Sequence, residues 1–343
     1  MRILLVTDAW EPQINGVCTT VKNVHKELNQ LGHEVLLFHP GLFWGVTIPG
    51  SGGVKLCYPF LKKKIARFKP DRVHIFTEGT LGFSARRACA KLELPFTTGY
   101  HTKFPEILNQ WYGIPIGLTR SYLRYFHSLS KGIFVPTRSM KGELISLDYL
   151  LSPAGKIHVW GRGVDSAHFS PPAWKRNALK MGTRRLICVS RAHCEKNLED
   201  FCALSGHGYS CTLVGGGSYL DTLKRNYPKV NFTGSMPPAD VGRALREADI
   251  FVFPSKADTF GLVMLEANAC GLPVVGYPVT GPKDWIKNGK NGYIAHDTSF
   301  ESLKFAVQMA SIHCAPKDAI SHAEGNTWEK TAQDFLALLH PCR

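Results

Sequence analysis

Short apolar segments of strand length alternate with longer amphipathic segments along the whole chain. In the first half, the apolar segments span residues 3–6, 34–39, 72–76, 96–100 and 132–135. Between them, apolar positions recur at helical spacing in residues 20–31, 80–91 and 118–130. Strands that alternate with helices in this way predict a parallel sheet with covering helices, because parallel strands need a crossover connection between them.

The same alternation starts again after residue 162, so we expect two units of this kind. Its strand-like segments span residues 185–190, 210–215, 229–233, 250–253 and 273–276. We predict an α/β protein with two Rossmann-like, doubly wound domains, residues 1–163 and 164–325, followed by a last helix within residues 326–343. Open parallel sheets bind ligands beyond the carboxyl ends of their strands, so two facing domains predict a deep cleft between them.

Composition narrows the class of protein without identifying a chemistry. The 343 residues are 44% hydrophobic and 20% charged, which is ordinary for a globular protein. No apolar run is long enough to span a bilayer, and the first residues fit a buried strand rather than a signal peptide. The ten cysteines form no C-x2-C pair, which argues against a zinc or thioredoxin-type site and predicts free thiols.

The formal net charge of +14 is concentrated in the first domain. Residues 1–163 carry a net charge of +11 and residues 164–343 one of +3, so the first domain is expected to meet an acidic partner. The densest basic cluster lies beside apolar residues and consists of Lys62, Lys63, Lys64, Arg67 and Lys69. It fits either a segment on anionic lipid headgroups or a solvated helix face. No nucleic-acid-binding motif accompanies it.

The strongest chemical signal is a pair of carboxylates, Asp258 and Glu266, eight positions apart. A buried strand precedes them, and the apolar run after Gly261 predicts a helix that begins near this glycine. The amides of Phe260, Gly261 and Leu262 would then lie at a helix N-terminus, where unpaired N–H groups and the helix dipole favour an anion. A loop carboxylate, a phosphate cradle and a helix carboxylate together suit a nucleoside diphosphate sugar.

Other residues could serve the same ligand. Arg191 and Lys196 follow the first strand of the second domain, where fixed positive charges would stabilise a leaving diphosphate. Asn15 and Gly16 form a turn before a helix of the first domain, and Gly16 lets the backbone approach a phosphate. His101 ends a strand, a place where a purely structural histidine is the ordinary alternative.

These motifs resemble those of the family-4 retaining glycosyltransferases of GT-B fold. The segment from Asp258 to Glu266 is similar to the Glu-x7-Glu signature of that family, with Asp258 in place of the first Glu. Arg191 and Lys196 are similar to its Arg-x4-Lys. The resemblance covers nearly the whole chain in family order and is strongest to bacterial lipid glycosyltransferases and mannosyltransferases.

The resemblance implies roles for the matched residues. Asp258 would bind hydroxyls of the donor sugar and Glu266 the ribose hydroxyls, while His101 would lie against the sugar near the reacting bond. His101, Arg191 and Lys196 would thus form the catalytic group. The other donor contacts would come from Asn15, Gly16, Gly215, Gly217, Met236, Phe260, Gly261 and Leu262. The final helix would cross back onto the first domain.

The resemblance also implies a reaction. We expect transfer of a hexose, with retention of configuration, from a nucleotide-sugar donor, UDP in preference to GDP. Family precedent favours departure and attack on one face of the sugar, with the leaving phosphate helping to take the acceptor's proton. Arg191 and Lys196 would replace a metal ion, so we expect neither a metal nor another cofactor.

The acceptor is expected to be a lipid such as diacylglycerol in an anionic membrane, because the basic cluster and the resemblance both favour it. The protein would then be cytoplasmic and peripheral on the cytosolic face of a membrane. A saccharide or polysaccharide acceptor is the alternative. A nucleotide-sugar epimerase would convert the donor without an acceptor, and a binding module would hold it without turnover. His101, Arg191, Lys196 and Glu266 argue against an inactive module.

Overall fold

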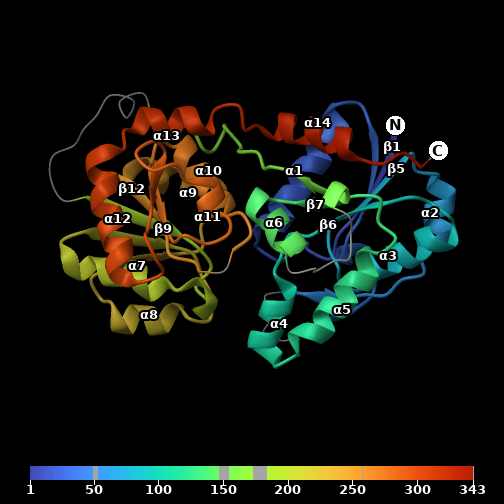
Figure 1. Cartoon of the computed structure of the whole chain (residues 1–343), viewed down its shortest axis with the longest axis horizontal. Helices are drawn as coiled ribbons and strands as arrows, with labels where there is room; N and C mark the ends of the chain where they lie inside the picture. Colours follow the sequence, from blue (N-terminus) through green and yellow to red (C-terminus); the bar gives the residue numbers. More distant parts are fainter. Residues whose placement is uncertain (49–52, 147–153, 173–183, 257, 343) are drawn as a thin grey trace. The chain divides into compact units, whose positions relative to one another are not determined.

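The computed structural model describes residues 1–48, 53–146, 154–172, 184–256 and 258–342. The chain divides into two compact units, which we call unit 1 (Met1–Arg162 with Trp328–Arg343) and unit 2 (Gly163–Thr327). Figure 1 shows the elements of both, coloured along the sequence. Each unit has a parallel sheet covered by helices on both faces, which confirms the predicted fold class.

In the described part of unit 1, the main sheet has the strand order β2-β1-β5-β6-β7-β8, and all its pairings are parallel. The strands are β1 (Arg2–Val6), β2 (Glu34–Phe38), β5 (Arg72–Ile75), β6 (Thr97–Gly99), β7 (Ile133–Val135) and β8 (Ile157–Val159). A short antiparallel hairpin of β3 (Val46–Thr47) and β4 (Lys55–Leu56) lies outside this sheet.

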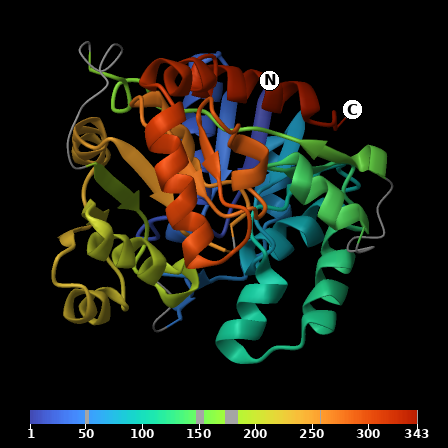
Figure 2. The same cartoon turned by 60° about the vertical axis from the view of Figure 1, so that its left-hand side comes forward.

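Helices α1 (Gly16–Gln30) and α14 (Trp328–Leu338) cover one face of the sheet of unit 1. On the other face lie α2 (Lys62–Phe68), α3 (Thr80–Lys91) and α5 (Ile116–His127). The remaining helical segments are α4 (Phe104–Tyr112), α6 (Arg138–Ser146) and the 3-10 turns η1 (Pro40–Leu42) and η2 (Ala154–Lys156). Figure 2 shows α4 and α5 side by side as a helical hairpin.

The last helix, α14, packs within unit 1 although it follows unit 2 in the sequence. Phe335 stacks on Phe76 with ring centroids 5.7 Å apart, and the indole N–H of Trp160 donates to the carbonyl of Thr331 at 3.0 Å. After the helix, the amide of Cys342 donates to the carbonyl of Asp71 at 2.9 Å. Aromatic packing and backbone hydrogen bonds therefore both attach the end of the chain to this sheet.

In the described part of unit 2, the sheet has the order β11-β10-β9-β12-β13-β14 and is again parallel. Its strands are β9 (Arg185–Val189), β10 (Ser210–Val214), β11 (Asn231–Gly234), β12 (Ile250–Phe253), β13 (Val274–Gly276) and β14 (Gly292–Ile294). In both units the predicted strands are confirmed with ends that differ by at most two residues, whereas β3, β4, β8 and β14 were not predicted.

The helices of unit 2 also form two layers. One face carries α7 (Leu198–Ala203), α8 (Leu220–Asn226) and α12 (Phe300–His313), and the other carries α9 (Pro238–Glu247), α10 (Leu262–Ala269) and α13 (Pro316–Ala323). The short segments are α11 (Pro282–Trp285), η4 (Cys194–Lys196) and η5 (Leu204–His207). Among the described residues no helix is both long and apolar enough to cross a membrane. All ten cysteines are free thiols, as predicted.

Candidate active site

The donor residues predicted in the second half of the chain gather at one edge of the sheet of unit 2. They lie in the loops after β9, β10, β11 and β12 and in the first turns of α10. Because the strands are parallel, all these loops leave the sheet at its carboxyl edge, which is where open α/β sheets bind ligands. This edge is the candidate site on unit 2.

Lys196 and Asp258 form an ion pair at this edge, with Lys196 Nζ 2.9 Å from Asp258 Oδ2. Both side chains are largely buried. Burial alone would raise the pKa of Asp258, but the charge and hydrogen bond of Lys196, with backbone N–H groups of Thr259 and Phe260, hold it below its usual value. Asp258 is therefore ionised at neutral pH. An ammonium has three N–H donors, so Lys196 keeps two for a second partner.

Gly261 is the N-cap of α10 and has a left-handed backbone, with φ of 80°. This conformation favours glycine, whereas a Cβ atom here would meet only the flexible end of Met264 at 2.7 Å and the Phe253 ring at 3.1 Å. The helix begins at Leu262, as predicted, and the amides around Gly261 lie at its N-terminus. Phe260 is half-buried, with its ring centroid 6.2 Å from that of Trp285.

Glu266 lies on the second turn of α10, with its side chain half-buried. Burial, with a smaller contribution from the negative charge of Asp165, raises the pKa of this carboxyl to about 7. Within the described part of the chain, no hydrogen bond stabilises its charge. A carboxylate held in this way gains most from a ligand that donates hydrogen bonds, such as a ribose diol.

The glycine loop after β10 lies directly against the loop after β9. A Cβ on Gly215 would be 1.9 Å from the carbonyl oxygen of Ser190, and one on Gly217 would be 2.3 Å from that of Ala192. Both glycines have positive φ values, 139° and 154°. The two loops can therefore approach this closely only without side chains, and they support the segment that carries Arg191 and Lys196.

The other predicted residues of unit 2 are less constrained. Arg191 is exposed, and the described residues offer its guanidinium no hydrogen-bond partner. Met236 follows β11, is half-buried and packs against the apolar cluster that includes Val214. The proposed contacts of Arg191 with a diphosphate and of Met236 with a base stay predictions.

The predicted residues of unit 1 have structural partners of their own. The side chain of Asn15 caps α1 by accepting from the amide of Cys18 at 2.9 Å, and Gly16 is exposed with open space around its Cα. His101 is buried. Its Nδ1 accepts from Arg162 Nη2 at 3.1 Å, and burial together with the Arg162 charge lowers its pKa well below the usual value.

The sequence pattern missed three residues that shape this site. Asp165 acts on the pKa of Glu266 from 101 positions away in the chain, a proximity that no spacing indicates. Asn197 and Asp200 connect the loops after β9 and β12. Only the left-handed φ of 50° at Asn197 has a signal in the sequence, because asparagine tolerates this conformation better than most residues.

Two family models match the chain. The model described as "Glycosyl transferases group 1" matches residues 173–311, and "Glycosyltransferase Family 4" matches residues 14–168. Together they span most of unit 2 and most of unit 1. The protein is a family-4 glycosyltransferase.

Several curated relatives align with this glycosyltransferase over most of its length. A GDP-mannose-dependent alpha-mannosyltransferase of Mycobacterium tuberculosis is 27% identical, over 98% of this chain and 95% of its own. Sulfoquinovosyl transferase SQD2 of Arabidopsis thaliana is 29% identical, over 82% and 61%. An alpha-monoglucosyldiacylglycerol synthase of Streptococcus pneumoniae is 26% identical, over 81% and 71%.

Solved structures place the glycosyltransferase in the GT-B fold. Sucrose-phosphate synthase from Thermosynechococcus elongatus superposes with a TM-score of 0.77 at 18% identity, over 98% of both chains. WaaG, described as a glycosyltransferase of lipopolysaccharide biosynthesis, superposes with a TM-score of 0.69 at 14% identity, over 98% of this chain and 99% of its own. At these identities the likeness concerns the fold alone.

Proposed function

We propose that this glycosyltransferase moves a hexose, with retention of configuration, from a nucleoside diphosphate donor to a hydroxyl group of a membrane lipid. The observation that carries the lipid acceptor is an exposed aromatic and basic surface on unit 1, described below. The donor side rests on the charged groups and glycine loops at the carboxyl edge of the unit 2 sheet.

On the donor side, each group of that edge has a partner in a nucleoside diphosphate sugar. Glu266 accepts hydrogen bonds from the ribose hydroxyls, and the amides at the start of α10 face the diphosphate or the sugar. Asp258 binds sugar hydroxyls while it holds Lys196. Lys196, with Arg191 from the same loop, contacts the diphosphate.

The chemical step breaks the bond between the anomeric carbon and the diphosphate oxygen, and the electron pair leaves with the diphosphate. The acceptor oxygen bonds to the same carbon, and its proton passes to the departing phosphate. Negative charge therefore grows on the diphosphate in the transition state, where Lys196 and Arg191 stabilise it. These two cations take the place of a metal ion, so we propose that chelation by EDTA leaves the rate unchanged.

The donor base is the less constrained part of the proposal. The resemblance favours UDP over GDP. Four of the relatives carry GDP-mannose in their names, one each from Mycobacterium tuberculosis and Corynebacterium glutamicum and two from Mycolicibacterium smegmatis. GDP-mannose and UDP-glucose are therefore the first two donors to compare.

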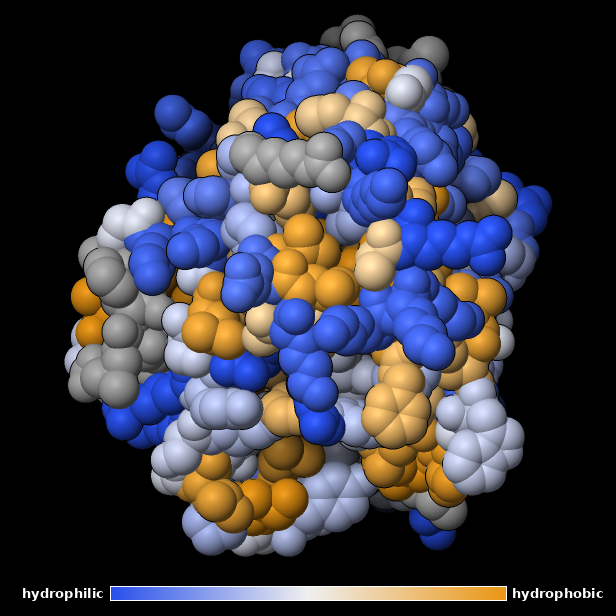
Figure 3. All heavy atoms as spheres, turned by 90° about the vertical axis from the view of Figure 1, so that its right-hand side faces the viewer, coloured by the Kyte–Doolittle hydropathy of each residue, from blue (hydrophilic) through white to orange (hydrophobic). Residues whose placement is uncertain are grey.

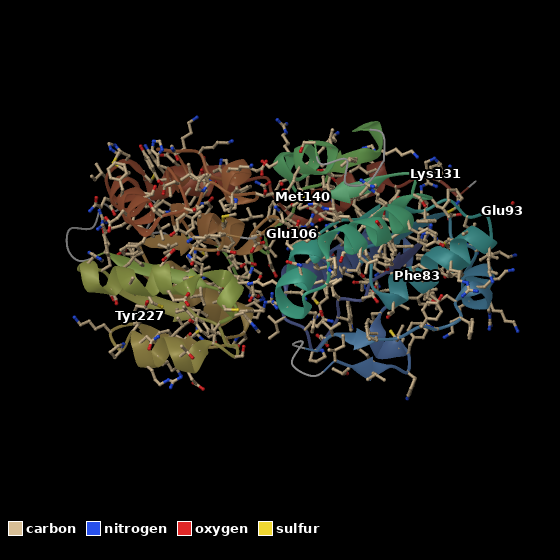
Figure 4. The ribbon with its side chains drawn as sticks, turned by 60° about the horizontal axis from the view of Figure 1, so that its bottom comes forward. Phe83, Glu93, Glu106, Lys131, Met140 and Tyr227 are labelled. Atoms are coloured by element: carbon tan, nitrogen blue, oxygen red, sulfur yellow. The ribbon has the colours of Figure 1, made fainter. Side chains whose placement is uncertain are left out.

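The surface that supports a lipid acceptor, here called the docking face, surrounds the start of α2 and runs along α3 and α5. Its aromatic members are Tyr58, Phe60, Phe83, Tyr122 and Tyr125. Phe60 is 90% exposed and Tyr125 is 56% exposed, so this is not a covered core. The ring centroid of Phe83, which Figure 4 labels, lies 6.1 to 6.3 Å from those of Tyr58, Tyr122 and Tyr125, so these four rings form one group.

Basic side chains border these rings. Lys62, Lys63, Lys64, Arg67 and Lys69 are all exposed on or just after α2, so the predicted basic cluster lies on the surface. Arg87 donates to the hydroxyl of Tyr58 at 3.2 Å. Figure 3 shows hydrophobic residues among strongly hydrophilic ones on the side of unit 1 that carries α2. Amphipathic aromatics with cations are the residues that suit an anionic membrane interface.

The names of relatives support a lipid acceptor. The alpha-monoglucosyldiacylglycerol synthases of Streptococcus pneumoniae and Acholeplasma laidlawii are named for a glycolipid product, and they align with 81% and 85% of this chain.

The deciding experiment offers radiolabelled GDP-mannose or UDP-glucose with two kinds of acceptor. One is vesicles of diacylglycerol with an anionic phospholipid, and the other is a panel of soluble saccharides. Labelled lipid, with an α-anomeric linkage by NMR, supports the proposal. Labelled saccharide in preference to lipid rejects the lipid acceptor, and a β linkage from these α-linked donors rejects retention.

A further inference from the structure

Asp200, on α7, joins three loops at the carboxyl edge of the unit 2 sheet through one carboxylate oxygen. Its Oδ2 accepts from the hydroxyl of Tyr277 at 2.5 Å and from the side-chain amide of Asn197, and it lies 3.3 Å from Lys256 Nζ. Asn197 follows β9, Lys256 follows β12 and Tyr277 follows β13. These are neighbouring strands in the sheet, so Asp200 ties adjacent parts of its carboxyl edge together.

Asn197 extends this connection to the backbone. Its side-chain amide also donates to the carbonyl of Pro254 at 3.3 Å, and its own φ of 50° turns the chain between η4 and α7. The residue immediately before it is Lys196, whose ammonium pairs with Asp258. Two sets of contacts thus connect the loop after β9 to the loop after β12. One set involves Asp200 and Asn197, and the other is the ion pair of Lys196 with Asp258.

The surroundings of Asp200 make the connection through Asp200 and Asn197 rigid. Tyr277 is fully buried, and burial together with its hydrogen bond to Asp200 raises the pKa of the phenol, so it remains a donor. The Asp200 side chain is 21% exposed, and Lys256 lies over the Tyr277 ring with Nζ 4.9 Å from the centroid. Hydrogen bonds to an ionised group are stronger than neutral ones, above all where water is scarce.

We propose that Asp200 is a positioning residue: it holds the loop that carries Lys196, and so fixes where the Lys196 ammonium contacts the leaving diphosphate. Asp200 touches no substrate in this scheme. It fixes Asn197, and Asn197 fixes the turn from which Lys196 reaches both Asp258 and the diphosphate. The inference rests on the proposed function, because only charge growing on the diphosphate makes the exact place of Lys196 matter for rate.

The test compares turnover and donor binding in Asp200→Asn, Lys196→Ala and the double variant. The asparagine amide keeps the size of the side chain but turns a donor toward Tyr277, Asn197 or Lys256. We expect Asp200→Asn to lower kcat by about tenfold with less than about a twofold change in donor affinity. In the Lys196→Ala background the same change should lower kcat by less than about twofold, because its effect passes through Lys196.

The matched control is Asp221→Asn on α8, the same chemical change at an exposed aspartate of the same unit. It should leave kcat and donor affinity at their wild-type values. If the two single losses multiply in the double variant, Asp200 acts independently of Lys196 and the inference is rejected. It is equally rejected if Asp200→Asn folds and retains full kcat.

A second readout separates failure of this inference from failure of the proposed function. Lysines are dimethylated with 13C-formaldehyde, and the Lys196 signal is assigned by its absence in Lys196→Ala. Asp200→Asn should shift that signal even if no donor is consumed by the wild type, and an unmoved signal rejects the inference without reference to activity. Should Asp200→Asn not fold, Asn197→Gly replaces it, since glycine retains the left-handed backbone.

Discussion

At the scale of single residues, Glu266 makes the site sensitive to pH. Its pKa of about 7, raised by burial and by Asp165, means that the carboxyl is about nine-tenths protonated at pH 6 and about nine-tenths ionised at pH 8. In the proposed donor complex, the ionised form is the one that would accept hydrogen bonds from two ribose hydroxyls. Donor affinity should therefore increase about tenfold from pH 6 to pH 8.

Calorimetry with intact UDP-glucose or GDP-mannose measures this effect without titration of the ligand, because a diphosphate diester has no proton to gain in this range. In Glu266→Gln the affinity should be weaker at pH 8 and independent of pH. A pH slope that persists in Glu266→Gln would assign the titration to another group, and wild-type affinity in that variant would remove Glu266 from the ribose.

His101 provides a second prediction at this scale. Arg162 has only donors, so the hydrogen bond of 3.1 Å to His101 Nδ1 requires the neutral tautomer with the proton on Nε2. Burial lowers the pKa of Arg162 to about 9, which still leaves it charged at pH 7. Between pH 8 and pH 6 the ring nitrogen shifts of His101 should stay constant and report this single tautomer.

The measurement is 15N NMR of histidine-labelled protein, with His101 assigned by its loss in His101→Gln. In Arg162→Met the preference for this tautomer should disappear. His25 on α1, whose Nε2 lies 3.2 Å from the side-chain amide of Asn29 and whose lowered pKa arises from burial without a contribution from Arg162, is the internal control and should not change. An Nδ1-protonated His101 in the wild type would contradict the geometry.

Local sequence cannot supply residue contacts of this kind. Strand ends and a helix start are local signals, and they were enough to indicate that four candidate residues share one sheet edge: Arg191, Lys196, Asp258 and Glu266. That Lys196 and Asp258 would meet in an ion pair across 62 positions was not predictable. Such pairings depend on strand order, which periodicity does not reveal.

At the scale of elements, α14 should contribute strongly to the stability of unit 1. Phe335 is fully buried and stacks on Phe76, and its ring centroid lies 4.9 Å from that of Trp160. Truncating a buried aromatic side chain removes its transfer free energy and leaves a cavity, so Phe335→Ala should cost about 3–5 kcal/mol. Denaturant unfolding followed by tryptophan fluorescence measures this loss, and the exposed neighbour Asp334→Ala should change it by less than about 0.5 kcal/mol.

If Phe335→Ala unfolds at the wild-type midpoint, the packing of α14 does not support the sheet of unit 1. The helix itself was predictable, because residues 327–339 show helical spacing and the structure has α14 at Trp328–Leu338. Strands β8 and β14 were not, because each lies at the edge of its sheet and is only partly buried. His158 interrupts the apolar residues of β8 and Gly292 begins β14, so neither forms a continuous apolar run. They are recognised only by their pairing with β7 and β13.

At the scale of the whole molecule, the uneven charge supports the proposal that unit 1 is the part that binds a membrane. Unit 1 contains nearly all of the sequence whose net charge is +11, and the docking face contains its densest exposed basic cluster. Each lysine near an anionic surface contributes about 1 kcal/mol, so replacing Lys62, Lys63 and Lys64 by glutamine should weaken vesicle binding about a hundredfold.

The matched control makes this a test of place rather than of total charge. Lys224, Arg225 and Lys229 are three exposed cations of unit 2, and their replacement by glutamine lowers the net charge by the same amount. Sedimentation with vesicles of increasing anionic lipid content should detect a loss in the α2 variant and almost none in the control. Salt should weaken vesicle binding of the wild type and of the control alike. It should weaken vesicle binding of the α2 variant less, because fewer charges of the docking face remain to be screened. Equal losses in both variants would mean that a diffuse positive potential, and not the docking face, brings the protein to the membrane.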